Sequence, residues 1–311
     1  MIGRVIPTDH DWYRFLAARD EAPEEVNFWQ PSSTKIARAE PGTPYFFKLK
    51  KPHYAVCGFA FFARFSVLPV WLAWQTFGTG NGCGDLQEMH RRIWKYWKGK
   101  GPIDTHAVGC ILLSKPVFFP PDHWIRQPED WPKHNLVSMR YDLIRGEGRR
   151  IWTECRERAA LLLPAAEMAQ IQETAAPGPR FGTPRFVAPR LGQGSFRIGV
   201  LDAYGRACAV TGEHSLPALE ASHIQDYAEG GPHEIRNGLL LRADLHGLFD
   251  RGYLTVTPDL RLEVSSRLKE EFHNGHTYYP FHGKRLHEPD SPEERPAREF
   301  LVWHNEKRFV A

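Results

Sequence analysis

The C-terminal third of the chain contains three segments that decide its fold: Leu219-Glu220-Ala221-Ser222-His223-Ile224, then Arg236-Asn237-Gly238-Leu239-Leu240-Leu241, then Leu245-His246-Gly247-Leu248-Phe249-Asp250. The first is a short apolar segment that ends at His223, and Gly230-Gly231-Pro232 after it is typical of a turn. Leu239 to Leu241 returns the chain, and the third segment has helical spacing. The order predicted is therefore strand, loop, strand, helix.

The predicted helix presents one imidazole and one carboxylate on the same side. His246 and Asp250 are four residues apart, which makes them neighbours on a helical face. Such a pair can hold one divalent cation. The imidazole of His223, with an ordinary pKa near 6.5, is suited to take a proton from water at neutral pH.

From about residue 193 to the C-terminus, these segments resemble the HNH nuclease family, whose fold is a ββα-metal hairpin and helix. The resemblance implies that His223 is the general base and that Asn237 braces the hairpin loop. It implies that His246 is a metal ligand on the helix and that Asp250 stands where members place a further ligand. The implied reaction is hydrolysis of a DNA phosphodiester to a 5′-phosphate and a 3′-hydroxyl, with the metal stabilising charge on the phosphate and the leaving oxygen.

Two departures from the family pattern concern metals. Many members have Asp or His, a metal ligand, immediately before the base histidine, whereas this chain has Ser222. Ligation is then expected to rest on His246, Asp250, water and phosphate oxygens, with one ion of Mg²⁺, or of Mn²⁺, Co²⁺ or Ni²⁺. Zinc-knuckle members carry paired cysteines near the site, but Cys208 is alone, so no structural zinc is expected.

Other polar residues near these segments have structural interpretations. Asp244 is expected to be the N-cap of the helix rather than a ligand. His214 and His233 are expected in exposed loops, and Glu220 is expected to face solvent or pair with an arginine.

The N-terminal half is predicted to contain a curved sheet. Residues 45–49, 55–62 and 108–113 are rich in aromatic and β-branched residues and bounded by Pro or Gly, as strands are. Asp85 and Glu88 form a capping box that begins a helix, which Gly99 and Gly101 end, and a second helix is predicted over 147–163.

This half resembles the PUA-like superfamily, which includes EVE, ASCH, SRA and YTH domains, in the segments 26–31, 41–48 and 56–60. Members recognise modified bases, often extruded into an aromatic cage, and stacking offsets the cost of extrusion. The candidate walls are Phe28, Trp29, Trp71 and Trp74, and the candidate readers of the base edge are Asn27 and Asn81. The alternative for each tryptophan is core packing.

Two basic clusters are candidates for contacts with the DNA backbone. The members are Arg91, Arg92, Lys95, Lys98 and Lys100 in the first, and Arg180, Arg185, Arg190 and Arg197 in the second. The alternative interpretation of the first cluster is a solvated helix face.

The fold class predicted is α+β with two domains, a PUA-like domain over 1–165 and an HNH domain over 193–311. Nine of the ten tryptophans precede residue 153, which separates the two halves by composition. Between them, the prolines and glycines of 164–197 argue against a helix or a central strand, so 166–192 is interpreted as a basic linker.

Composition excludes several classes of protein. With 311 residues, 42% hydrophobic and 25% charged, the chain is globular, and no apolar run approaches the roughly 20 residues of a membrane span. The first residues lack the pattern of a secretory signal, so a cytoplasmic location and no membrane partner are expected. Five scattered cysteines make disulfides unexpected, and a net charge of +3 alone does not indicate a polyanionic partner.

The function predicted is that of a modification-dependent DNA restriction endonuclease, which recognises a modified base, with modified cytosine foremost, and cuts nearby. The alternatives are an HNH restriction nuclease that reads unmodified sequence and a nucleic-acid-binding module with a degenerate nuclease. The partner expected is double-stranded DNA. A homodimer is expected, because cutting two strands requires two active sites.

Overall fold

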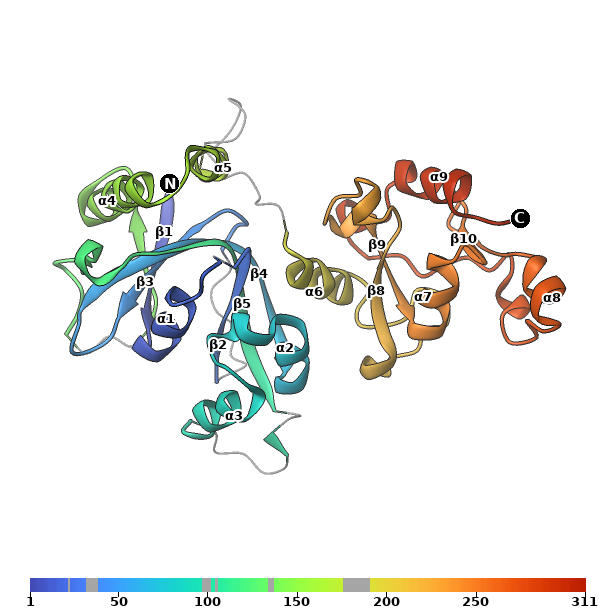
Figure 1. The fold of residues 1–311 in the computed structure, drawn as a ribbon, viewed down its shortest axis with the longest axis horizontal. Coiled ribbons are helices and arrows are strands. Elements are labelled where there is room, and N and C mark those ends of the chain that lie inside the picture. The colour runs from blue at the N-terminus through green and yellow to red at the C-terminus, as the bar shows by residue number, and fades with distance from the viewer. Residues whose placement is uncertain (22, 32–38, 97–101, 104–105, 134–136, 176–190) are drawn as a thin grey trace. The chain divides into compact units, whose positions relative to one another are not determined.

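The computed structural model describes residues 1–21, 23–31, 39–96, 102–103, 106–133, 137–175 and 191–311. It divides into two compact units, Met1–Gly192 and Gln193–Ala311, each combining helices with sheets (Figure 1). The fold is therefore of the α+β class, as predicted.

The first unit is built on one mixed sheet with the strand order β2-β5-β4-β3-β1-β7, to which β6 adds beside β4. Only the pair of β1 and β3 is parallel among the strand pairs of the described residues, and the other pairs are antiparallel. The strands are β1 (Ile2–Thr8), β2 (Glu25–Gln30), β3 (Pro44–Leu49), β4 (Ala55–Pro69), β5 (Ala107–Phe118), β6 (Ile125–Arg126) and β7 (Met139–Asp142).

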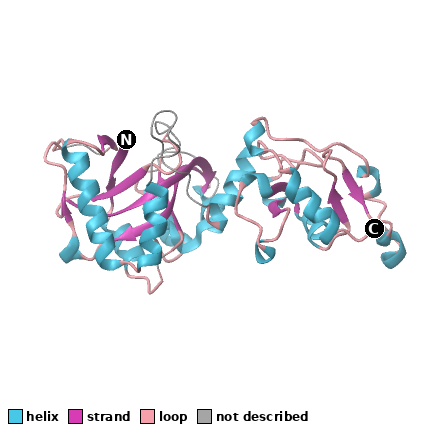
Figure 2. Ribbon diagram, turned by 90° about the horizontal axis from the view of Figure 1, so that it is seen from above, coloured by secondary structure: helices cyan, strands magenta, loops and turns pink. Residues whose placement is uncertain are grey.

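Alternating side chains give this sheet two apolar faces. Val5 and Phe46 pack on one face with Trp152 of the helix α4 (Gly146–Leu162). Ile6 and Phe47 pack on the other face with Trp12 of the helix α1 (His10–Ala17). Figure 2 shows helices packed along the strands of this sheet. Since successive residues of a strand point to opposite sides, both faces of the sheet are buried.

The predicted strands are confirmed as β3, β4 and β5 of one sheet, but β4 continues seven residues beyond the predicted end, to Pro69. Its pairing with β5 shifts register between Phe59 and Phe61 and again between Phe62 and Arg64. Bulges of this kind bend a strand without ending it. Pro69 then precedes the helix α2 (Val70–Phe77).

Both predicted helices of the first unit are present, but the first ends at Trp94, before the predicted stop at Gly99. Asp85 caps α3 (Leu86–Trp94) by accepting a 2.6 Å hydrogen bond from the Glu88 amide, and α4 covers nearly all of 147–163. The predicted linker, by contrast, begins with the helix α5 (Ala165–Ala175). The expectation that 164–197 holds no helix is wrong at both ends of the segment. After Pro164 the residues are good helix formers up to Ala175, and a further helix begins at Gln193, after the last proline and despite Gly194. Residues 97–101 and 176–190, with Lys98, Lys100, Arg180, Arg185 and Arg190, lie outside the described residues.

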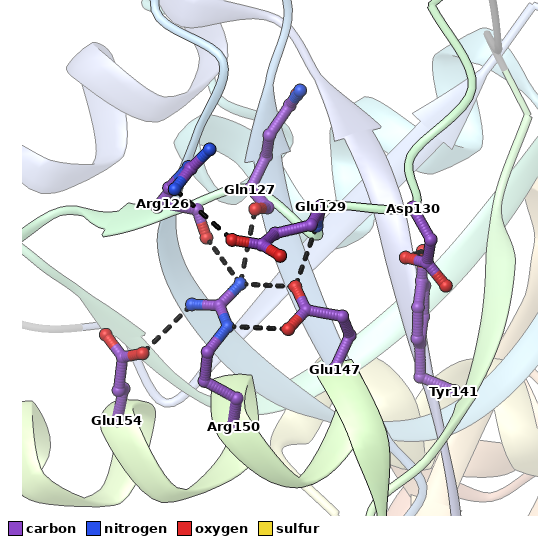
Figure 3. Close-up of polar contacts among 8 residues, drawn as sticks. All are labelled: Arg126, Gln127, Glu129, Asp130, Tyr141, Glu147, Arg150 and Glu154. Atoms are coloured by element: carbon purple, nitrogen blue, oxygen red, sulfur yellow. Dashed lines mark hydrogen bonds and ion pairs between the residues drawn. The ribbon is translucent and has the colours of Figure 1, made fainter.

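A cluster of ion pairs holds the start of α4 (Figure 3). The guanidinium of Arg150 bonds to Glu147 at 2.7 Å and to Glu154 at 2.9 Å, and to the carbonyl oxygens of Arg126 and Gln127 at 3.2 Å. The carboxylate of Glu147 also accepts the Glu129 amide. The cluster joins α4 to the segment that follows β6.

The second unit carries two small hairpins with helices around them. The first hairpin pairs β8 with β9, and the second pairs β10 with β11. The elements are α6 (Gln193–Ala203), β8 (Leu219–His223), β9 (Gly238–Arg242), α7 (Ala243–Asp250), β10 (Leu254–Val256), β11 (Leu262–Val264), α8 (Arg267–Phe272) and α9 (Arg298–Lys307). The predicted order of strand, loop, strand and helix is confirmed in β8, β9 and α7.

The buried His304 fixes α9 against the rest of the second unit. Its Nδ1 lies 2.8 Å from the Thr255 hydroxyl, its Nε2 lies 3.2 Å from the Phe249 carbonyl, and its ring stacks on Phe249 at 3.8 Å. Burial lowers the pKa of His304 to about 4, although the hydrogen bond to Phe249 acts in the opposite direction. The fold therefore requires a neutral imidazole.

The stability of the protein is expected to fall as the pH falls through the range set by His304. In the unfolded chain this imidazole titrates near 6.5, and in the folded chain near 4. Its stabilising contribution is thus complete above pH 6.5 and is lost between pH 6.5 and 4, by roughly 3 kcal/mol at most. Urea unfolding at pH 7, 6, 5 and 4 measures this loss, and His304→Gln should be less stable at pH 7 but flatter with pH. An equal pH slope in both proteins would contradict the assignment.

All five cysteines are buried as free thiols. Burial raises the pKa of the Cys57 and Cys155 thiols, and it raises that of Cys83 to about 12. Over the described residues, none of the helices combines the length and the apolar character that crossing a membrane requires.

Candidate active site

The hairpin of β8 and β9 places His223 opposite Gly238. A Cβ at Gly238 would lie 2.4 Å from a methyl group of Val200 and 3.1 Å from the ring of Phe196, both on α6. Only glycine therefore allows α6 to approach the hairpin this closely. The approach brings the Phe196 ring parallel to the His223 ring, with centroids 3.9 Å apart.

Asn237, fully buried, holds the loop between the two strands. Its Oδ1 accepts the Gln225 amide at 2.9 Å, and its Nδ2 donates to the carbonyl oxygens of Gln225 at 2.9 Å and Pro232 at 3.0 Å. Its backbone carbonyl also accepts the Ile224 amide at 2.9 Å. One side chain therefore ties both ends of the loop together, directly beside His223.

His223 lies partly buried at the end of β8, next to the imidazole of His233. Burial lowers its pKa to about 4, and the charges of His233 and His246 act in the same direction, while Asp250 opposes them. His246 and Asp250 on α7 therefore lie within electrostatic range of His223. With this pKa, His223 is neutral at physiological pH.

His233 was expected in an exposed loop, and the structure places it against His223 instead. Its Nδ1 lies 2.9 Å from His223 Nε2, and its ring stacks on Tyr227 with centroids 4.3 Å apart. The expectation fails because Asn237 fixes the carbonyl of Pro232, the preceding residue. A histidine four residues before the bracing asparagine was the signal in the sequence.

His246 lies between two carboxylates. Its Nδ1 is 2.6 Å from Glu220 Oε2, and its Nε2 is 3.2 Å from Asp250 Oδ2. Burial acts to lower the pKa of His246, but Asp250 and Glu220 outweigh it and raise the pKa. Glu220 was expected to face solvent or to pair with an arginine, and it contacts His246 instead. Its charge also acts on Arg197 of α6, where it opposes the effect of burial on the pKa.

These contacts fit a cation ligand. When Nδ1–H donates to a carboxylate, the lone pair of the imidazole is at Nε2, here on the side of Asp250. One nitrogen and one carboxylate oxygen then lie 3.2 Å apart, close enough to bind the same divalent cation. Among the residues that the structure describes, no group of three or more His, Cys, Asp or Glu side chains converges as a metal site. The remaining ligands of a cation at His246 and Asp250 would be water and phosphate oxygens.

Asp244 had been expected to be the N-cap of α7, but it is not. The helix begins at Ala243 and Arg242 occupies the cap position. The Asp244 carboxylate instead forms an ion pair with the Arg242 guanidinium, with contacts of 2.9 and 2.6 Å. This pair lowers the pKa of Asp244.

In the first unit, the two asparagines predicted to read a base are buried and bonded to each other. Asn27 Nδ2 donates to Asn81 Oδ1 at 2.9 Å, and Asn81 Nδ2 donates to the carbonyls of Ala73 and Gly78. Within the described part of the chain, the buried Oδ1 of Asn27 has no hydrogen-bond partner. One unused acceptor therefore remains in this pair.

The four aromatic candidates for the walls of a base pocket have different surroundings. Phe28 packs against Trp12 and Phe47 of the core, with ring centroids 5.2 and 6.4 Å apart. Trp29 donates from Nε1 to the Asn81 carbonyl at 3.0 Å. Trp71 and Trp74 lie half-buried on α2. Of the four, Trp29 is tied to the asparagine pair through Asn81.

The described basic candidates differ in their availability. Arg91 and Lys95 are exposed at the end of α3, where Trp94 is also 59% exposed rather than buried. Arg92 is bound to Glu88 at 2.5 Å and to the Gly82 carbonyl at 2.9 Å. Arg197 lies half-buried on α6, and burial lowers its pKa. Arg91 and Lys95 therefore remain the described side chains best placed to meet a phosphate.

Comparison with known proteins identifies one domain. Residues 208–257 match the family described as HNH endonuclease. No curated protein matches the chain. The crystal structure of ASCH from Zymomonas mobilis is similar to part of this chain. The alignment covers 49% of this chain and 94% of the ASCH chain, at 11% identity and a TM-score of 0.35. A second similar structure is described as a modification dependent TagI restriction endonuclease. The alignment covers 97% of this chain and 80% of the TagI chain, at 13% identity and a TM-score of 0.30.

Proposed function

We propose that this chain, whose residues 208–257 match the HNH endonuclease family, is a modification-dependent DNA restriction endonuclease. In this proposal the first unit recognises a modified base, with modified cytosine as the first candidate, and the second unit hydrolyses the DNA backbone. The observation that carries the nuclease part is the position of His223 at the end of β8, beside the loop that Asn237 braces and within electrostatic range of His246 and Asp250.

In the proposed reaction, His223 removes a proton from water. The water oxygen forms a bond to phosphorus, and the bond from phosphorus to the 3′ oxygen breaks. The 3′ oxygen takes a proton from solvent water and His223 later releases its own proton to solvent, so the products are a 5′-phosphate and a 3′-hydroxyl. A buried base with a pKa of about 4 is unprotonated throughout the neutral range, so it is always available. Stacking on Phe196 holds the ring in place during this step.

A divalent cation is part of this proposal, and His246 and Asp250 are the residues that would hold it. When bound, the cation stabilises negative charge on the phosphate and the leaving oxygen. Glu220 orients His246 by accepting its Nδ1–H. The mixed nitrogen and oxygen donors suit Mn²⁺, Co²⁺ or Ni²⁺ as well as Mg²⁺.

Base recognition is proposed for the region of Trp29, Trp71 and Trp74, with Phe28 behind them. The unused Oδ1 of Asn27, next to Asn81, could accept a hydrogen bond from the amino group on the edge of a base. Arg91, Lys95 and Arg197 are proposed as phosphate contacts, together with Arg92 when it leaves Glu88. We further propose a homodimer, because two strands must be cut and residues 208–257 provide one HNH site per chain.

Cleavage of matched DNA tests this function. One substrate carries modified cytosine and the other has the same sequence unmodified, and each is incubated with Mg²⁺, Mn²⁺, Co²⁺ or Ni²⁺. The modified DNA should be cut at least about tenfold faster, which corresponds to ~1.4 kcal/mol of discrimination. Equal cutting would favour a nuclease that reads unmodified sequence. DNA binding without cutting under every metal would favour a binding module with a degenerate nuclease.

A further inference from the structure

The loop between β8 and β9 places the imidazole of His233 beside that of His223, the proposed base. His233 Nδ1 and His223 Nε2 are 2.9 Å apart, which is the length of a hydrogen bond. Stacking on Tyr227, with an interplanar angle of 5°, fixes the plane of the His233 ring. The loop backbone is fixed as well, because a Cβ at Gly231 would lie 1.9 Å from the Gln225 carbonyl oxygen.

A hydrogen bond between two imidazole nitrogens contains one proton, and its position decides the chemistry of His223. If Nε2 of His223 holds the proton, the lone pair of the neutral ring is at Nδ1, and Nδ1 is the base. If Nδ1 of His233 holds the proton, His223 accepts at Nε2 and keeps its own proton at Nδ1. The second arrangement leaves no lone pair for water.

Among the described residues, no second hydrogen bond to the His223 ring selects between these tautomers. Phe196 contacts the face of the His223 ring, and the one hydrogen bond of that ring among the described residues is to His233. Nδ1 of His223 therefore has no competing protein partner there. It is the nitrogen left for a water molecule.

We propose that His233 is a positioning residue for the nuclease, which accepts the Nε2–H of His223 and so keeps the lone pair of His223 at Nδ1. The inference rests on the proposed function, since it assigns a helper to the same base. When Nδ1 takes a proton from water, one O–H bond breaks and one N–H bond forms. The resulting imidazolium donates from Nε2 to His233, which stabilises its charge.

Three variants of the full chain separate positioning from packing. His233→Ala removes the acceptor. His233→Asn keeps one, because the Asn Oδ1 lies at nearly the same distance from Cβ as the His Nδ1. His214→Ala is the matched control, because His214 is an exposed histidine of the same unit outside the site.

The first measurement is the ¹⁵N spectrum of the histidine rings in the metal-free protein, which reports the tautomer of each ring without any cleavage. His223 should be protonated at Nε2 in the wild type and in His233→Asn, and shifted towards the Nδ1–H tautomer in His233→Ala. An unchanged tautomer in His233→Ala would overturn the inference. This measurement stands even if no DNA substrate is found.

The second measurement is the rate of DNA cleavage against substrate concentration. His233→Ala should lower kcat by about 10- to 100-fold with little change in KM, as the loss of an orienting partner does elsewhere. His233→Asn should stay within about threefold of the wild type, because it keeps an acceptor for Nε2–H of His223. A wild-type rate in His233→Ala, or equal losses in the Ala and Asn variants, would overturn the role. Absence of cleavage by the wild type itself would instead contradict the proposed function.

Discussion

Replacing His223 with alanine is expected to lower the rate of DNA cleavage by about 10²- to 10⁴-fold, the range that a general base contributes. The imidazole at the end of β8 is the group proposed to take the proton from water, and its burial keeps it neutral. Binding of DNA should be nearly unchanged, because phosphate contacts are proposed for other residues. Single-turnover cleavage and a parallel binding titration measure the two effects separately.

The interpretation of this variant depends on the fold remaining intact. The His223 ring stacks on Phe196, so its removal leaves a gap beside α6. A thermal unfolding curve close to that of the wild type shows that the gap is tolerated. Loss of binding in parallel with cleavage would mean that His223 is structural, and would contradict its assignment as the base.

Replacing His246 with alanine is expected to abolish cation-dependent cleavage and to weaken Mn²⁺ binding by at least about 100-fold, the upper end of the cost of losing a group that merely supports a ligand. His246 is the one nitrogen donor of the proposed pair, and Asp250 alone cannot hold an ion tightly. Calorimetry with Mn²⁺ and the protein without DNA measures the affinity directly. Chelation of the cation should stop wild-type cleavage in the same way.

Asp244→Ala is the matched control for this variant. Asp244 lies on the same helix and carries the same charge as Asp250, but its carboxylate is bound to Arg242. It should keep both Mn²⁺ affinity and cleavage. Unchanged Mn²⁺ affinity in His246→Ala would mean that the cation does not bind at α7. A loss of Mn²⁺ affinity in Asp244→Ala would mean that Asp244 is also a ligand.

The sequence was sufficient to predict the hairpin and helix of the second unit, because each part has a local signal. An apolar strand ends at His223, glycines and a proline mark the turn, and the spacing of His246 and Asp250 is helical. The braced loop is harder to foresee. His233 reaches His223 only because the amide of Asn237 fixes the backbone between them.

Glu220 shows a second limit of local patterns. Its contact with His246 joins residues 26 positions apart, from β8 and α7. The same limit applies to β1, which pairs with β3 and with β7 near residue 140. Pairings of this kind depend on the whole sheet, and a window of neighbouring residues does not contain them.

Because all five thiols are buried, their reactivity can be used to measure local unfolding of the protein. Cys57, Cys83, Cys110 and Cys155 belong to the first unit, and Cys208 is the one cysteine of the second. An alkylating reagent can reach each sulfur only when the surrounding packing opens, so the rate of alkylation at each site follows the frequency of that event. Mass spectrometry of the alkylated peptides therefore compares how often the two units open locally, without any engineered label.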